Sequence, residues 1–87
     1  MSQNEKLKKR VLSIPTDLTY TEFVRFMNMY GYIENDSGSG SRVKFYKKVG
    51  DDILVLSMHK PHGNSGPKLK HYAIKQAIDF LKMHGEL

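Results

Sequence analysis

Residues 41–59 read SRVKFYKKVGDDILVLSMH, two segments of alternating polarity separated by a Gly-Asp pair. Successive side chains of a β-strand point to opposite faces, so Val43 and Phe45 share one face of the first segment. The other face of that segment carries Arg42, Lys44, Tyr46 and Lys48. Gly50-Asp51 suits a two-residue turn. The stretch therefore predicts an antiparallel β-hairpin formed by residues 41–49 and 53–59.

The register of this hairpin follows from its apolar faces. A turn centred on Gly50-Asp51 pairs Phe45 with Leu56 and Val43 with Met58, so the apolar side chains of both strands share one face. A shift of one residue would place Phe45 against polar-face residues, which burial of the apolar face forbids. The register is therefore predicted together with the turn.

The same register brings polar side chains together on the opposite face. It places Arg42 opposite His59, and Lys44 opposite Ser57. The Cβ atoms of directly opposed residues lie roughly 5 Å apart. An arginine, a histidine, a lysine and a serine are thus expected to converge at one end of the hairpin.

Two amphipathic helices are predicted, one on each side of the hairpin in the sequence. Residues 19–22 (TYTE) match a capping box, and apolar side chains then recur about every 3.6 residues until Gly31 ends the helix. A second helix is predicted from Lys68 to about His84, with a broad apolar stripe. Residues 32–34 predict a short strand between the first helix and the hairpin.

The resulting α-β-β-β-α order predicts a two-layer α+β domain, in which two helices cover one face of a three-stranded antiparallel sheet. Double-stranded RNA-binding domains have this layout, although a fold alone does not assign a function. We expect residues 1–18 to form a basic, solvated tail followed by an extended lead-in that stops at Pro15. Residues 19–87 are expected to form the single domain.

The composition narrows the class of protein. Fourteen Lys and Arg against nine Asp and Glu give a net charge of +5, which favours a polyanionic partner, either a nucleic acid or an acidic protein. The absence of cysteine excludes a disulfide framework and a thiolate metal site. No apolar run approaches the ~18 residues of a membrane span, and no signal peptide is recognisable. We therefore expect a soluble, cytoplasmic protein without a membrane partner.

The histidines near the end of the hairpin are the candidate catalytic groups. His59 and His62 are the side chains of this region that exchange protons near neutral pH. RNA cleavage by the 2′-hydroxyl requires a proton acceptor, a proton donor and cations that stabilise the phosphorane, but no metal or other cofactor. The candidate substrate-binding residues are Ser41, Arg42, Lys44, Lys68 and Lys70. The alternative, that both histidines are ordinary surface residues, stays open from the sequence.

A family resemblance adds to these observations. Residues 38–45 (GSGSRVKF) and 59–62 (HKPH), followed by residues 68–70 (KLK) and an amphipathic helix, resemble the HicA family. Members of this family are the toxin endoribonucleases of bacterial HicA–HicB toxin–antitoxin pairs. The resemblance runs from about Tyr20 to the C-terminus. It implies a metal-independent enzyme that cleaves mRNA, inhibits translation and is neutralised by a HicB antitoxin.

The chain departs from that family at one position. The catalytic histidine of the family usually follows a Gly-Ser or Gly-Gly pair at the start of the second strand, where this chain has Arg42 after Gly40-Ser41. A guanidinium stays protonated and is a poor base, but it binds phosphate or carboxylate well. Either His59, which the register places beside Arg42, takes the catalytic role, or the chain binds RNA without efficient cleavage.

Two further functions stay open. One is a non-catalytic module for double-stranded RNA, which reads helix shape and 2′-hydroxyls. The other is a protein-interaction domain whose basic face docks an acidic partner.

Overall fold

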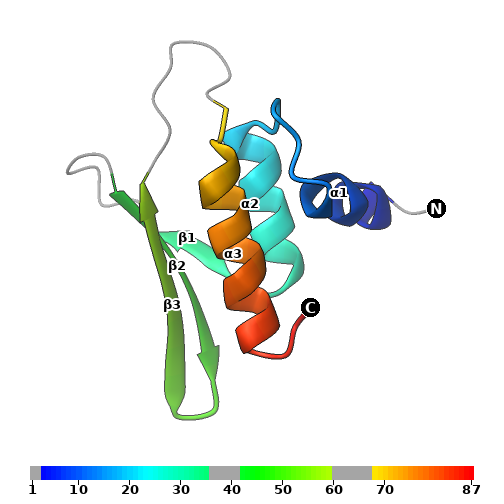
Figure 1. Cartoon of the computed structure of the whole chain (residues 1–87). Helices are drawn as coiled ribbons and strands as arrows, with labels where there is room; N and C mark the ends of the chain where they lie inside the picture. The colour runs from blue at the N-terminus through cyan, green and yellow to red at the C-terminus, as the bar shows by residue number, and fades with distance from the viewer. Residues whose placement is uncertain (1–2, 36–41, 60–67) are drawn as a thin grey trace.

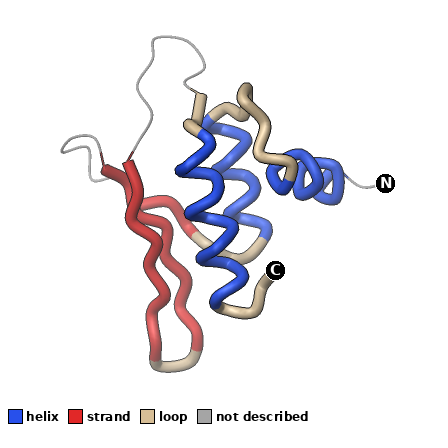
Figure 2. Tube along the Cα trace, in the orientation of Figure 1, coloured by secondary structure: helices blue, strands red, loops and turns tan. Residues whose placement is uncertain are grey.

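The computed structural model describes residues 3–35, 42–59 and 68–87, which form a small α+β fold (Figure 1). The helices are α1 (Gln3–Leu12), α2 (Tyr20–Met29) and α3 (His71–Met83), and the strands are β1 (Ile33–Asn35), β2 (Arg42–Val49) and β3 (Asp52–His59). The strands form one antiparallel sheet in the order β1-β2-β3, and the helices lie to one side of it in the view of Figure 2. The predicted α+β class and antiparallel sheet are confirmed.

The β2–β3 hairpin has the predicted register. Phe45 pairs with Leu56 and Arg42 pairs with His59, in register with a turn centred on Gly50-Asp51. Gly50 adopts a φ of +60°, a left-handed conformation that glycine accepts without the steric cost of a Cβ atom. Turn chemistry and burial of one apolar face therefore select the same pairing.

The hydrophobic core joins the apolar face of the hairpin to the helices. Its buried residues include Val43, Phe45, Leu56 and Met58 of the sheet, Phe23, Phe26 and Met27 of α2, and Ala73, Ile74, Ala77, Ile78 and Leu81 of α3. The rings of Phe45 and Phe23 meet edge to face, with centroids 5.4 Å apart and an angle of 80° between their planes. This confirms the predicted core faces of β2 and β3.

Helix α1 corrects the prediction of a solvated tail and an extended lead-in over residues 1–18. Residues 3–12 are helical, and Leu7 and Val11 are buried in the core. These side chains lie four residues apart and therefore share one side of the helix, which packs beside α2. The dense positive charge of this segment is typical of a solvated tail, but the four-residue spacing of Leu7 and Val11 is that of one helix side.

The N-terminus of α2 has the predicted capping box, which also binds α1. The hydroxyl of Thr19 accepts a hydrogen bond from the Glu22 backbone N–H, while a Glu22 carboxylate oxygen accepts from the Thr19 backbone N–H. Arg10 Nε donates to the other Glu22 oxygen at 3.1 Å, and Arg10 Nη2 forms an ion pair with Asp17 at 3.1 Å. Arg10, assigned to the basic tail, therefore joins α1 to the start of α2.

Replacing Glu22 by glutamine should remove a pH-dependent contribution to stability. The Thr19 backbone N–H and then Arg10 lower the pKa of Glu22 in the folded state. The ionised carboxylate therefore stabilises the fold above its ordinary pKa, and this stabilisation is lost as the pH falls through the lowered pKa. In urea unfolding, Glu22→Gln should be less stable than the wild type at neutral pH, and the two proteins should converge in acid.

Asp51→Asn is the matched control for this measurement, because Asp51 is exposed in the hairpin turn. Its unfolding free energy should follow that of the wild type at every pH. A Glu22→Gln deficit of constant size from neutral to acidic pH would contradict the assignment of the effect to the carboxylate.

Helix α3 begins at His71, three residues after the predicted start at Lys68. The Leu69 backbone N–H donates to the Leu18 carbonyl at 2.9 Å, and Lys68 forms an antiparallel bridge with Thr19. This pairing with the segment before α2 holds residues 68–69 outside the helix. Among the residues that the structure describes, no helix combines the length and hydropathy needed to cross a membrane.

Candidate nucleic-acid interface

The sheet face opposite the core is exposed and carries the predicted polar cluster. Arg42, where β2 begins, pairs with His59, where β3 ends, and Lys44 pairs with Ser57 on the same face. Arg42, Lys44 and His59 are exposed, and Ser57 is half-buried. The predicted convergence of these four residues at one end of the hairpin is therefore confirmed.

The Arg42 side chain leans across the hairpin toward Ser57. Its Nη1 atom donates to Ser57 Oγ at 3.5 Å, a long and therefore weak hydrogen bond. A guanidinium has five N–H donors in a planar fork, so this contact engages only part of its capacity. Because Arg42 is exposed, its remaining donors are available to a phosphate or a carboxylate.

A row of exposed apolar side chains crosses the same face. Ile33 of β1 pairs with Tyr46 of β2, which pairs with Val55 of β3, and their exposed fractions are 56%, 37% and 46%. Ile53 lies on this face opposite Lys48. We call this surface the open face; it consists of Ile33, Arg42, Lys44, Tyr46, Lys48, Ile53, Val55, Ser57 and His59. Aromatic and apolar side chains between cations suit stacked bases as well as a protein partner.

The cations of the open face form no ion pair with a carboxylate of the described residues. In the described part of the chain, the ion pairs involve the cations Arg10 and Lys47, not Arg42, Lys44 or Lys48. Lys47 points to the opposite, core side of β2, where it is half-buried and pairs with Glu86. Within residues 3–35, 42–59 and 68–87, the positive charge of the open face therefore has no ion-pair partner, and a polyanion would meet it there.

Lys68 and Lys70 lie at the same end of the molecule as this cluster. Figure 1 shows the start of β2, the end of β3 and the start of α3 near one another at that end. Both lysines are exposed, and Lys70 is the N-cap residue of α3. Helix α3 packs on the core side of the sheet, so these lysines extend from the helical layer rather than from the open face.

The other two predicted site residues, Ser41 and His62, lie outside the described residues. Over residues 3–35, 42–59 and 68–87, no group of three histidine or carboxylate side chains is arranged to hold a metal ion. No protein-family model, curated protein or solved structure matches the chain. The chemistry of the open face and the short motifs in the sequence therefore carry the functional argument.

One feature of this site, the apolar row, was not predicted from the sequence. Tyr46 was placed on the polar face of the first strand without a role, and no role was assigned to Ile53 or Val55. The signal was present, because the two strands carry apolar residues on both faces, which a sheet buried on one side does not require. Ile33 joins the apolar row because β1 pairs with β2 in the register that places Ile33 opposite Tyr46.

Proposed function

We propose that this protein is a HicA-like endoribonuclease that binds mRNA on the open face and cleaves it without a metal ion. The observation that supports this best is the grouping of Arg42, Lys44 and His59 on one exposed surface. An imidazole beside a guanidinium and an ammonium group provides a group for proton transfer next to groups that bind phosphate.

In the proposed reaction, the ribose 2′-hydroxyl attacks the adjacent phosphorus and the bond from phosphorus to the 5′ oxygen breaks. A base takes the hydroxyl proton and an acid gives a proton to the departing oxygen, so a cyclic phosphate and a 5′-hydroxyl are formed. His59 is proposed for one of these roles and His62 for the other. Arg42 and Lys44 would stabilise the charge on the phosphorane, while Lys68 and Lys70 would bind the strand beyond it.

A HicB-type antitoxin is the proposed protein partner. The carboxylates of an acidic polypeptide on the open face would pair with Arg42, Lys44 and Lys48. Its apolar side chains would pack on the exposed row of Ile33, Tyr46 and Val55. We also propose that the fold is of the double-stranded-RNA-binding type, with α1 as an N-terminal addition.

A second candidate is a non-catalytic RNA-binding module. It is favoured by Arg42, which occupies the position where the resemblance implies a catalytic histidine. Such a module would bind double-stranded RNA by its shape and 2′-hydroxyls and leave it intact. A third candidate, a basic protein-interaction domain, would use the same open face for an acidic partner alone.

RNA binding and cleavage by the purified protein test these candidates. In the presence of a chelator, the wild type should cleave labelled single-stranded RNA, and its affinity should fall steeply with salt. Lys44→Ala should weaken binding and lower the salt slope by about one phosphate contact. Lys8→Ala, which removes an exposed lysine of α1, is the matched control and should leave the slope unchanged.

Each outcome selects one candidate. Binding without cleavage would leave the non-catalytic module, especially if duplex RNA binds more tightly than a single strand. No binding at low salt would exclude both RNA functions and leave the protein-interaction domain. An unchanged salt slope in Lys44→Ala would remove Lys44 from the phosphate contacts.

A further inference from the structure

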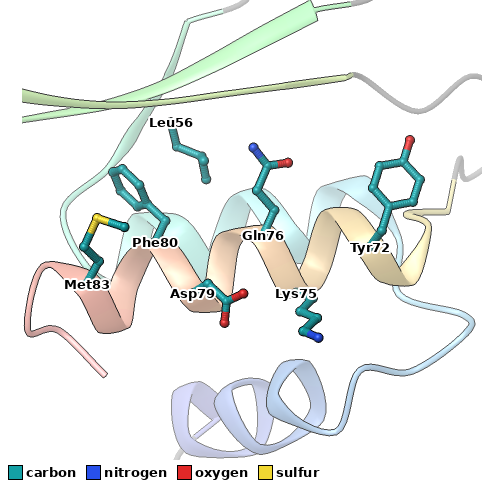
Figure 3. A pocket seen from close by; sticks show the side chains of 7 residues that line it. All are labelled: Leu56, Tyr72, Lys75, Gln76, Asp79, Phe80 and Met83. Carbon is teal, nitrogen blue, oxygen red and sulfur yellow. The ribbon is translucent and has the colours of Figure 1, made fainter.

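The outer side of α3 carries a line of exposed side chains beside the edge strand β3. We call these residues the α3 stripe: Tyr72, Lys75, Gln76, Asp79 and Met83. With Leu56 and Phe80 they line an open pocket between helix and strand (Figure 3). Tyr72, Gln76, Asp79 and Met83 follow one another at steps of three or four residues, and Lys75 lies three residues after Tyr72 and four before Asp79, so all five lie along one side of the helix. Tyr72 and Met83 are 53% and 78% exposed.

The α3 stripe is nearly symmetric about its midpoint in where its apolar and charged residues lie. An apolar residue lies at each end, and a cation and an anion lie between them. Position 77 is midway between Lys75 and Asp79, and it is also close to midway between Tyr72 and Met83. In a two-fold symmetric contact, residue i of one copy meets residue j of the other and the reverse, so each pairing occurs twice.

We propose that the α3 stripe is a homodimer contact, in which α3 packs antiparallel against α3 of a second copy of this chain. Lys75 of each copy then meets Asp79 of the other, and Tyr72 of each copy meets Met83 of the other. Neither Lys75 nor Asp79 has an ion pair within the part of the chain that the structure describes. The lysine also precedes the aspartate by four residues, the less favourable order for pairing within one helix.

The charge of the α3 stripe favours a second copy over other occupants. One lysine and one aspartate give this surface no net charge, in contrast to the open face. It therefore attracts RNA or a strongly acidic protein less than the open face does. A surface that carries both charges in symmetric positions is complementary to itself.

The contact is also expected to join the helices rather than extend the sheet. An edge strand such as β3 offers unpaired backbone groups to an added strand. Gln76 Nε2, however, donates to the Ser57 carbonyl at 3.3 Å, so one acceptor of β3 is already bound by a side chain of α3. A strand added there would have to displace Gln76. A helix-to-helix contact leaves this hydrogen bond in place.

This inference is independent of the proposed function. The α3 stripe and the open face belong to different surfaces, since α3 packs on the core side of the sheet. Dimerisation would leave the open face of each copy accessible.

Charge reversal tests the dimer directly. In sedimentation at increasing concentration, the wild type should reach twice the single-chain mass of 10.0 kDa. Lys75→Asp and Asp79→Lys should each remain at the single-chain mass, because each places like charges opposite one another in a self-contact. An equimolar mixture of these two variants should recover the double mass, since a mixed pair has opposite charges at both contacts. Lys8→Asp, the same charge change on α1, should dimerise like the wild type.

The double variant Lys75→Asp/Asp79→Lys distinguishes a lost dimer contact from a failure of the single variants to fold. It reverses both charges, retains the complementarity and should again reach the double mass. A wild type that stays at the single-chain mass at every concentration would overturn the proposal. So would single variants that dimerise unaided, or a folded mixture and a folded double variant that both stay monomeric.

Discussion

His59→Ala should lower the rate of RNA cleavage by about 10²- to 10⁴-fold, the usual effect of removing a general acid or base. His59 is the one proposed proton-transfer group among the described residues of the open face, and it lies opposite Arg42. RNA affinity should change little, because Arg42 and Lys44 still bind the phosphates. The two effects are measured by single-turnover cleavage with saturating protein and by titration of an uncleavable RNA.

His84→Ala is the matched control for this loss. His84 is also exposed, but it follows the last turn of α3, where its ring contacts Phe80 rather than the open face. Cleavage by His84→Ala should equal that of the wild type. Full activity in His59→Ala would remove His59 from the mechanism and leave His62 as the histidine to examine. A parallel loss of affinity and rate would instead make His59 a binding residue.

The hairpin was predictable because two independent constraints agree on it. Gly50-Asp51 limits the turn, and burial of Val43 and Phe45 permits only one pairing partner for each. The facing of Arg42 and His59 follows from that pairing without further information. Helix α2 was predictable for a similar reason, because a capping box and a long apolar stripe mark the same segment.

The features that the sequence did not predict depend on contacts between distant segments. Helix α1 buries only Leu7 and Val11, and their burial requires the position of α2. The start of α3 depends on the pairing of Leu69 with Leu18, about fifty residues apart in the chain, a contact that no local pattern reveals. The exposure of Ile33 likewise depends on how β1 pairs with β2. Because β1 has only three residues, its alternation pattern does not determine that register.

The residues of the candidate site also differ in whether local sequence or tertiary contacts determine their position. Arg42, Lys44, Ser57 and His59 were placed correctly because they belong to one hairpin. Lys68 and Lys70 were expected within the first turn of a helix, but both precede α3. Their relation to the open face is set by tertiary packing, which a local pattern in the sequence does not reveal.

Phe45→Ala should lower the free energy of unfolding by about 3–5 kcal/mol, the usual cost of removing a buried phenylalanine ring. Phe45 is fully buried, pairs with Leu56 and packs edge to face on Phe23, so its loss leaves a cavity between the sheet and α2. A domain of this size has a total stability of only about 5–15 kcal/mol, and a large share of it would be lost. Urea unfolding followed by circular dichroism measures the change.

Tyr46→Ala is the control that separates the two faces of the same strand. Tyr46 is the next residue, carries a ring of similar size and lies on the open face with 37% of its surface exposed. Its removal should cost far less stability than the removal of Phe45, because solvent already reaches the ring and no enclosed cavity forms. Equal losses in the two variants would contradict the assignment of faces. The placement of Arg42 and His59 would then fail with it, because both residues are assigned to the open face by the same alternation along β2 and β3.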